Sequence, residues 1–231
     1  MLGRHTQTLF QAGGINMQVQ KSQPSPSWCD DHSPLVLTEI FSPSNSVAIW
    51  KREENATVSQ YFESAFEALG LGIRGVFSIN TLKDAISDML PDYEGKQKAV
   101  NDIYLLSDIL TCLFECDAVG LRIAPLTSAM CPSFHIDNIP VRLVHTYVGS
   151  GTQWLPVEAL YENAPQNVKG NFTKTNFGRF YDKNHIQQMS AFDVGLLKGK
   201  AWQDHEQMAA VHRSCQVQTH EKRVLLTLDP M

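Results

Sequence analysis

The spacing of apolar residues changes near the middle of the chain, from a helical period to a strand period. Over residues 55–70, apolar side chains recur every three or four positions, which places them on one face of a helix. The positions of this stripe are Val58, Phe62, Ala65, Phe66 and Leu69. Asn55 or Thr57 can cap the start of the helix and Gly70 can end it. The pattern therefore predicts a helix over 55–70.

Two more helices are expected in the first half of the chain. Residues 81–91 show a short helical pattern that ends at a proline, and residues 96–117 show a long one. The inward positions of the long helix are Val100, Ile103, Leu106, Ile109, Leu110 and Leu113. Upstream, the β-rich runs 35–41 and 46–52 flank a Ser-Pro-Ser-Asn turn and predict a pair of strands. We therefore expect residues 35–117 to form a mostly helical layer.

The second half of the chain has the composition and short runs typical of strands. The β-rich runs cover 119–124, 141–148, 192–199, 208–214 and 222–229. Between the second and third runs lies a long polar stretch, 156–190, and its length indicates a lid-like insertion. Residues 1–34 are rich in Pro, Ser and Asp and are expected to be loosely ordered. We expect a single α+β domain over 35–231, with helices packed against a β-core over 118–231.

Composition excludes several classes of protein. The 231 residues are 43% hydrophobic and 19% charged, which is typical of a globular protein with a sizeable core. A net charge of -5 disfavours non-specific binding to nucleic acid or to an anionic membrane. No apolar run approaches the length of a membrane span, and the first residues lack the apolar segment of a secretory signal. Five cysteines without a Cys-x-x-Cys pair indicate a reducing cytoplasm.

The candidate chemistry lies in the second half of the chain. His135 and Asp137 stand two residues apart just before the second strand run, a spacing that lets both side chains face one ion. His212 is the best third ligand, and Arg223 heads the next strand. Two histidines and one carboxylate leave open positions on a metal, as in non-haem Fe(II) oxygenases. An inward-facing arginine needs an anion, and the carboxylate of 2-oxoglutarate would supply one.

The same residues also allow a structural interpretation. His135 and Asp137 can form a polar turn, His212 can be a core histidine, and Arg223 can lie on the surface. Arg122 and Arg142 could replace Arg223 as the partner of an anion, although an ion pair is favoured for them. We expect a structural role for His145 and a solvated position for His185, His205 and His220.

Several segments resemble the bacterial family called domain of unknown function 1826. They read GLRI, CPSFHIDNIPVRLVHTYVGSGTQWLP, VGLLKG, VHRS and RVLLTLD. The resemblance covers most of 119–231 and extends weakly into the helical part. The family has no assigned reaction, but its gene neighbourhoods suggest a link to zinc homeostasis. Cys215 stands where the family pattern leads us to expect proline, which puts the turn after His212 in question.

A more distant resemblance is to 2-oxoglutarate-dependent oxygenases, which share the order His-x-Asp, then His, then Arg on the next strand. It implies a C-terminal double-stranded β-helix, the jelly-roll or cupin-like fold. It also implies Fe(II) and 2-oxoglutarate as cofactors and an oxidised substrate that the sequence does not identify. The implied metal ligands are His135, Asp137 and His212. The implied contacts to 2-oxoglutarate are Arg223, Thr227 and Tyr147.

Two other functions stay open. The first is a metal-binding protein without oxygenase activity, which could hold zinc with the same three ligands. Cys131, four residues before His135, would then be a natural fourth ligand. The second is a scaffold without chemistry. Metal analysis and a titration with 2-oxoglutarate would separate the three possibilities.

Overall fold

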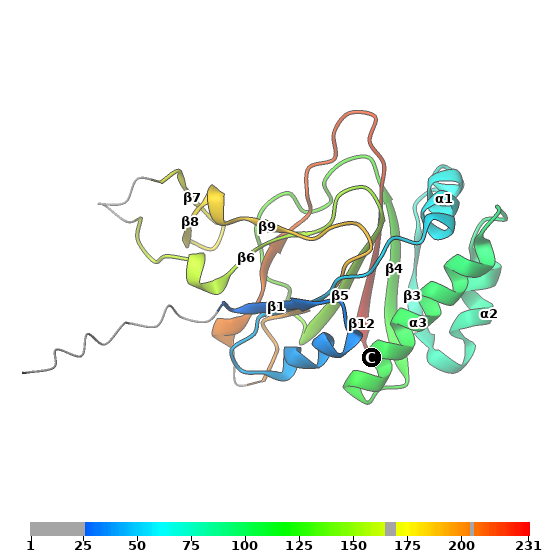
Figure 1. Cartoon of the computed structure of the whole chain (residues 1–231), viewed down its shortest axis with the longest axis horizontal. Helices are drawn as coiled ribbons and strands as arrows, with labels where there is room; N and C mark the ends of the chain where they lie inside the picture. Colours follow the sequence, from blue (N-terminus) through cyan, green and yellow to red (C-terminus); the bar gives the residue numbers. More distant parts are fainter. Residues whose placement is uncertain (1–25, 165–169, 204–205) are drawn as a thin grey trace, which may run out of the picture.

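A seven-stranded sheet forms the centre of the protein (Figure 1). The computed structural model describes residues 26–164, 170–203 and 206–231. The strands of this main sheet, in spatial order, are β1 (Trp28–Asp31), β2 (Val47–Trp50), β10 (Val194–Lys198), β5 (Val141–Val148), β12 (Arg223–Pro230), β4 (Ala118–Leu126) and β3 (Ile73–Ser78). Its neighbouring strands are antiparallel, except that β1 runs parallel to β2.

A smaller sheet packs against one face of the main sheet. Its three strands, in spatial order, are β11 (Val211–Arg213), β6 (Gln153–Leu155) and β9 (Gln187–Gln188). Between the two sheets, Val144 and Leu197 of the main sheet form a buried cluster with Trp154 of β6. A separate hairpin consists of β7 (Phe172–Lys174) and β8 (Phe180–Asp182).

Three helices cover the other face of the main sheet (Figure 1). They are α1 (Ala56–Ala65), α2 (Ile79–Met89) and α3 (Lys96–Phe114). The largest buried cluster lies between these helices and the sheet, and it includes Phe62 of α1, Leu106 of α3 and Leu226 of β12. The helix face therefore holds most of the hydrophobic core, whereas the second face carries the polar residues described below.

The three helices form where they were predicted, although α1 ends at Ala65, five residues before the expected end at Gly70. The Asn55 side chain caps α1 by accepting a hydrogen bond from the backbone N–H of Val58 at 3.3 Å. Beyond the end of α1 the chain reaches Gly70 in the left-handed region, with φ of 55°, as expected of a residue that ends a helix. Helices α2 and α3 begin and end within three residues of the expected bounds.

The prediction of a strand over 35–41 is wrong. These residues form a 3-10 helix, η1 (Pro34–Phe41), which begins with a proline and a capping Ser33. Its buried residues are Val36, Leu37 and Ile40, whose spacing is helical and not alternating. Strand β2 pairs with β1 instead, and β1 lies inside the segment that was expected to be loosely ordered.

Strands from the first half of the chain extend the main sheet on both sides. β1 and β2 form one edge and β3 forms the other, so the β-structure is not confined to 118–231. The polar stretch 156–190 contributes β9 to the smaller sheet and also contains the β7–β8 hairpin. Part of this stretch, 165–169, lies outside the described residues, and its role as a lid stays a prediction, as does the division into domains. Within the part of the chain that the structure describes, no helix has both the length and the apolar character needed to cross a membrane.

Candidate metal centre

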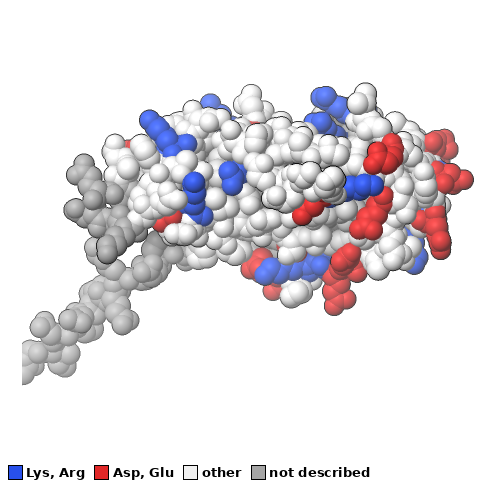
Figure 2. Space-filling model, turned by 90° about the horizontal axis from the view of Figure 1, so that it is seen from above, with Lys and Arg blue, Asp and Glu red and all other residues white. Residues whose placement is uncertain are grey.

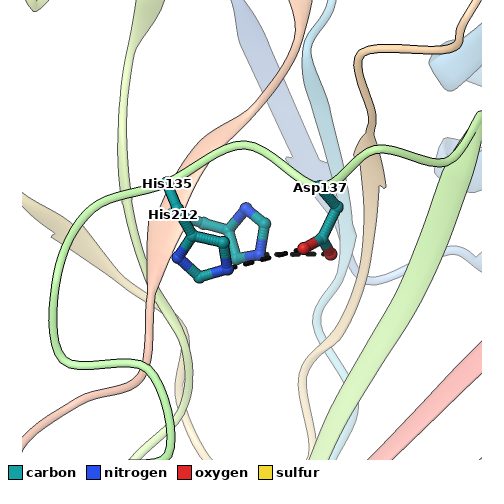
Figure 3. Close-up of side chains that lie close together, drawn as sticks. All are labelled: His135, Asp137 and His212. Carbon is teal, nitrogen blue, oxygen red and sulfur yellow. Dashed lines mark ion pairs between the residues drawn. The ribbon is translucent and has the colours of Figure 1, made fainter. Parts of the chain in front are cut away.

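His135, Asp137 and His212 point toward one another on the side of the main sheet opposite the helices (Figure 3). His135 and Asp137 lie on the loop that leads into β5, and His212 lies in β11. The Nε2 atoms of the two histidines are each 3.5 Å from an oxygen of Asp137. All three ligand atoms lie within 4.8 Å of one another. Atoms bound to one metal at about 2.0–2.2 Å lie roughly 3–4 Å apart, so this arrangement suits a single ion.

Backbone contacts hold the two histidines in place. His135 and His212 form an isolated β-bridge in which each backbone N–H donates to the carbonyl oxygen of the other at 3.0 Å. Nδ1 of His135 is 3.0 Å from the carbonyl oxygen of Ser133, and Nδ1 of His212 is 3.0 Å from that of Ala210. A proton on each Nδ1 satisfies both carbonyls, and this tautomer leaves the Nε2 lone pairs directed at the metal position.

Arg142 holds the carboxylate of Asp137 in place through a hydrogen bond between opposite charges. Its Nη1 donates to Oδ2 of Asp137 at 2.7 Å, while Nε and Nη2 donate to the two oxygens of Asp229 at 2.7 Å each. The bidentate bond to Asp229 orients the guanidinium. Arg142 therefore acts as a positioning residue for Asp137: it binds Oδ2, which also lies near His212, and it leaves Oδ1 toward His135.

The carboxyl group of Asp137 stays ionised. Burial alone would raise its pKa, but the contacts with the imidazoles of His135 and His212 in the metal-free protein and the charge of Arg142 together hold the pKa well below its usual range. The same contact with Asp137 raises the pKa of His135. An ionised carboxylate beside two imidazoles is a donor set that a divalent metal prefers.

A cavity of about 150 Å³ opens beside the three ligands. Its wall includes Cys131, Val144, Thr152, Ser214, Leu225 and Thr227, together with the three ligands and three arginines. Pockets for drug-sized ligands measure about 300–1,000 Å³, so this cavity suits a smaller molecule. A wider depression of about 500 Å³ lies beside Glu63, His220 and Lys222, but within the described ranges no cluster of metal-ligating side chains lies there.

Arg223 lies behind the wall of this cavity and is 1% exposed. Its Nε donates to the carbonyl oxygen of Ser150 at 2.8 Å, and its Nη2 donates to the hydroxyls of Thr152 at 3.2 Å and Thr146 at 3.3 Å. Its Nη1 lies 3.5 Å from the hydroxyl of Ser214. No carboxylate among residues 26–164, 170–203 and 207–231 lies within ion-pair distance of it. Burial lowers the pKa of this guanidinium, but arginine keeps its charge at neutral pH.

The structure brings most of the predicted site residues together, but not Tyr147. Thr227 lines the cavity, two residues along β12 from Leu225 and four from Arg223. Tyr147 lies on the opposite face of β5, where its ring stacks on Phe62 at 4.2 Å between centroids. Strand parity explains this correction: alternate residues of a strand face opposite sides, and Val144 of β5 faces the cavity.

The other candidates have clear positions. Arg142 forms the predicted ion pairs, whereas Arg122 lines the cavity and makes none with a described residue. Cys131 lines the cavity too, but it does not belong to the group of ligand atoms around the metal position. His145 is buried, as expected of a structural histidine. His185 and His220 are exposed, and His205 lies outside the described residues.

Several functional residues could not be singled out from the sequence. Asp229 holds Arg142, and the hydroxyls of Thr146, Thr152 and Ser214 surround Arg223. Asp229 shares the strand parity of Arg223 and Thr227, which is a signal that could have placed it on the same face. The hydroxyl groups come from three separate elements, so no local pattern marks them.

One protein-family profile matches most of the chain. A family profile described as "Protein of unknown function (DUF1826)" matches residues 31–229. The chain belongs to this family. It resembles no curated protein closely enough to count as a match.

Solved structures with a similar fold include a dioxygenase in complex with 2-oxoglutarate. The dioxygenase for auxin oxidation 1 from Arabidopsis thaliana, in complex with 2-oxoglutarate, matches with a TM-score of 0.50 and 10% identity over 88% of this chain and 91% of that one. At this identity the likeness shows the fold alone, a double-stranded β-helix. The rice dioxygenase for auxin oxidation gives a TM-score of 0.46 at 12% identity, over 80% of this chain and 73% of that one. HygX from Streptomyces hygroscopicus, with nickel and 2-oxoglutarate bound, gives 0.43 at 12% identity over 85% of each chain.

Proposed function

We propose that the protein is an Fe(II)- and 2-oxoglutarate-dependent oxygenase. In this proposal His135, Asp137 and His212 hold the metal and leave positions open toward the cavity. The observation that carries the proposal is Arg223, a buried guanidinium that lies behind the same cavity and lacks a carboxylate partner among the described residues. An isolated buried charge is costly, so this position suits an anionic ligand.

The cosubstrate would span the cavity. Its keto-acid end would lie at the metal and its other carboxylate would accept a hydrogen bond from Arg223, with Thr227 as a further donor. The carbonyl oxygen of Ser150 and the hydroxyls of Thr146, Thr152 and Ser214 orient the guanidinium by accepting from four of its five N–H groups, which leaves one N–H of Nη1 for the carboxylate. When bound, Fe(II) and 2-oxoglutarate would supply the activation of O₂, with one oxygen atom passing to the substrate and the other to the cosubstrate, which becomes succinate and CO₂.

The test is consumption of 2-oxoglutarate by protein loaded with Fe(II) under anaerobic conditions and then exposed to air. We expect succinate to form with the wild type and with His185→Ala, a control that removes an exposed histidine. We expect no succinate with His135→Ala or His212→Ala, whose metal content should fall as well. Normal metal content together with no turnover and no binding of 2-oxoglutarate would instead favour a metal-binding protein.

That alternative, a zinc-binding protein, has less support in the geometry. A closed zinc site needs four protein ligands, and Cys131 was the expected fourth. Cys131 lies on the cavity wall and outside the group of three ligand atoms that converge. The open position on the cavity side fits a catalytic metal better than a structural one.

A further inference from the structure

Two arginines face each other across strands β3 and β4, next to the cavity. Arg74 of β3 is directly opposite Arg122 of β4, and Arg122 is in turn directly opposite Thr227 of β12. Residues paired in this way point to the same side of a sheet. Because Thr227 and Arg122 both line the cavity, Arg74 stands one strand further out on the same face.

No acidic group neutralises this arginine pair. Neither Arg74 nor Arg122 has a carboxylate within ion-pair distance among the residues that the structure describes. The acidic side chain on the same face of β12 is Asp229, and Arg142 occupies both of its oxygens. Like charges directly opposite each other destabilise a sheet. The arrangement therefore costs stability unless an anion lies between the two guanidinium groups.

The arginine pair is open to solvent. The smaller sheet packs against β2, β5 and β10 and leaves the β3 edge uncovered, so that Arg74 and Arg122 are both exposed. Val76, two residues beyond Arg74 on the same face, is 64% exposed and lies opposite Gly120, which has no side chain to cover it. An apolar surface thus adjoins the charged one.

This positive surface is local and does not follow from the overall charge. The chain carries a net charge of -5. In the view of Figure 2 the acidic side chains gather at the right-hand end, over the helices. A cluster of one sign beside a cavity raises the local concentration of molecules with the opposite charge.

We propose that Arg74 and Arg122 bind an anionic group of the substrate, a carboxylate or a phosphate, carried on a partly apolar body that lies along Val76. The description of this ligand as the substrate rests on the proposed oxygenase function, whereas the anion site itself does not. The site is distinct from Arg223, which lies behind the cavity wall at β12 and would hold the cosubstrate.

The experiment measures binding of two small anions, inorganic phosphate and acetate, by calorimetry and thermal melting at low salt. It uses metal-free protein and protein loaded with Zn(II) and 2-oxoglutarate. The variants are Arg74→Gln and Arg122→Gln. Arg179→Gln is the matched control, because it makes the same charge change at an arginine that pairs with Glu162 beside the β7–β8 hairpin, which lies at the other end of the molecule from β3 and β4 in Figure 1.

We expect at least one of the anions to bind the wild type and the control alike, and to bind each of the other two variants at least about tenfold more weakly. Without added anion, Arg74→Gln and Arg122→Gln should melt at a higher temperature than the wild type, since the repulsion is gone. Equal anion affinity in all four proteins, or no binding to the wild type, would overturn the proposal.

Two outcomes separate this proposal from the proposed function. If Arg223→Leu abolishes phosphate binding while Arg74→Gln and Arg122→Gln retain it, the anion occupies the cosubstrate position and the substrate proposal is wrong. If the arginine pair binds the anion but loaded protein never binds 2-oxoglutarate, the oxygenase function fails and the anion site remains.

Discussion

The polar side chains on the two faces of strand β5 have different surroundings. On its cavity face, Arg142 and Thr146 contact charged or hydroxyl-bearing partners around a cavity of about 150 Å³. On its helix face, His145 and Tyr147 pack against Phe192 in the hydrophobic core. Both faces contain polar atoms with incomplete hydrogen bonding, yet only one of them opens to a ligand-sized space.

The comparison shows that an unsatisfied buried atom does not by itself make a site. Nε2 of His145 and the hydroxyl of Tyr147 have no hydrogen-bond partner among the described residues. Burial lowers the pKa of His145 to about 4 and raises that of Tyr147 well above its usual value, so both groups stay neutral. Arg223 cannot lose its charge in this way, and it lies beside the cavity. His145 and Tyr147 are therefore neutral where they are buried, whereas Arg223 keeps its charge and would be stabilised by an anion.

The largest expected effect is on the cavity face. Asp137→Asn removes the charge that balances the metal and leaves the amide beside Arg142. We expect affinity for Ni(II) or Fe(II) to fall at least about 100-fold, because loss of a direct ligand should exceed the tenfold to 100-fold effect typical of an outer-shell change. Calorimetric metal titration measures this, with His185→Ala as the control. Unchanged affinity would place the metal elsewhere.

The second expected effect is a loss of stability at acidic pH, caused by His145 on the helix face of β5. His145 has a pKa of about 4 in the folded protein and about 6.5 when unfolded. As the pH falls from 6.5 toward 4, the unfolded state takes up a proton that the folded state does not, so stability is lost. The difference of 2.5 pH units corresponds to about 3 kcal/mol of unfolding free energy at pH 4. Urea unfolding at pH 7, 5.5 and 4 tests this prediction. Between pH 7 and pH 4, the unfolding free energy of His145→Gln should fall by about 3 kcal/mol less than that of the wild type.

The third effect compares the stability contributions of half-buried Arg142 and buried Arg223. Arg142→Leu leaves Asp137 and Asp229 without their partner, and we expect a loss of about 1–3 kcal/mol in unfolding free energy. Arg223→Leu leaves only a carbonyl and hydroxyl groups behind, so its cost should be smaller by about 1 kcal/mol or more. Urea unfolding of metal-free protein at pH 7 measures both. A greater loss from Arg223→Leu would mean that Arg223 is primarily structural.

The smallest effect is expected at Tyr147. Tyr147→Phe removes a hydroxyl that has no partner among the described residues, so stability should change by less than about 1 kcal/mol. Affinity for 2-oxoglutarate should change less than twofold, since the ring lies on the helix face. A tenfold loss of that affinity would show that the two faces are coupled.

Part of the candidate site could be predicted from spacing along the chain. His135 and Asp137 are two residues apart, although they lie on the loop before β5 and not in a strand, and Arg223 shares a strand face with Thr227. The face of Tyr147 could not be predicted, because β5 is buried on both sides and its residues show no polar and apolar alternation. The bond between Arg142 and Asp229 joins residues 87 positions apart and depends on the sheet register.

The fold, too, could be predicted only where the sequence carries a clear local pattern. Helical periods in the first half were sufficient to place α1, α2 and α3. The short strands β1 and β3 were missed, because four to six residues with distant partners carry little local signal. η1 was misread because a short apolar run fits a strand and a helical turn equally well.

The most direct test of the central claim is a calorimetric titration of 2-oxoglutarate into anaerobic, metal-loaded protein, with the wild type and Arg223→Leu side by side. The account predicts binding to the wild type and at least a tenfold weaker affinity in the variant, because a charge-assisted hydrogen bond contributes about 1.5–3 kcal/mol. Metal affinity should be the same in both, since Arg223 is not a ligand. No binding to the metal-loaded wild type, or equal binding to both proteins, would contradict the account.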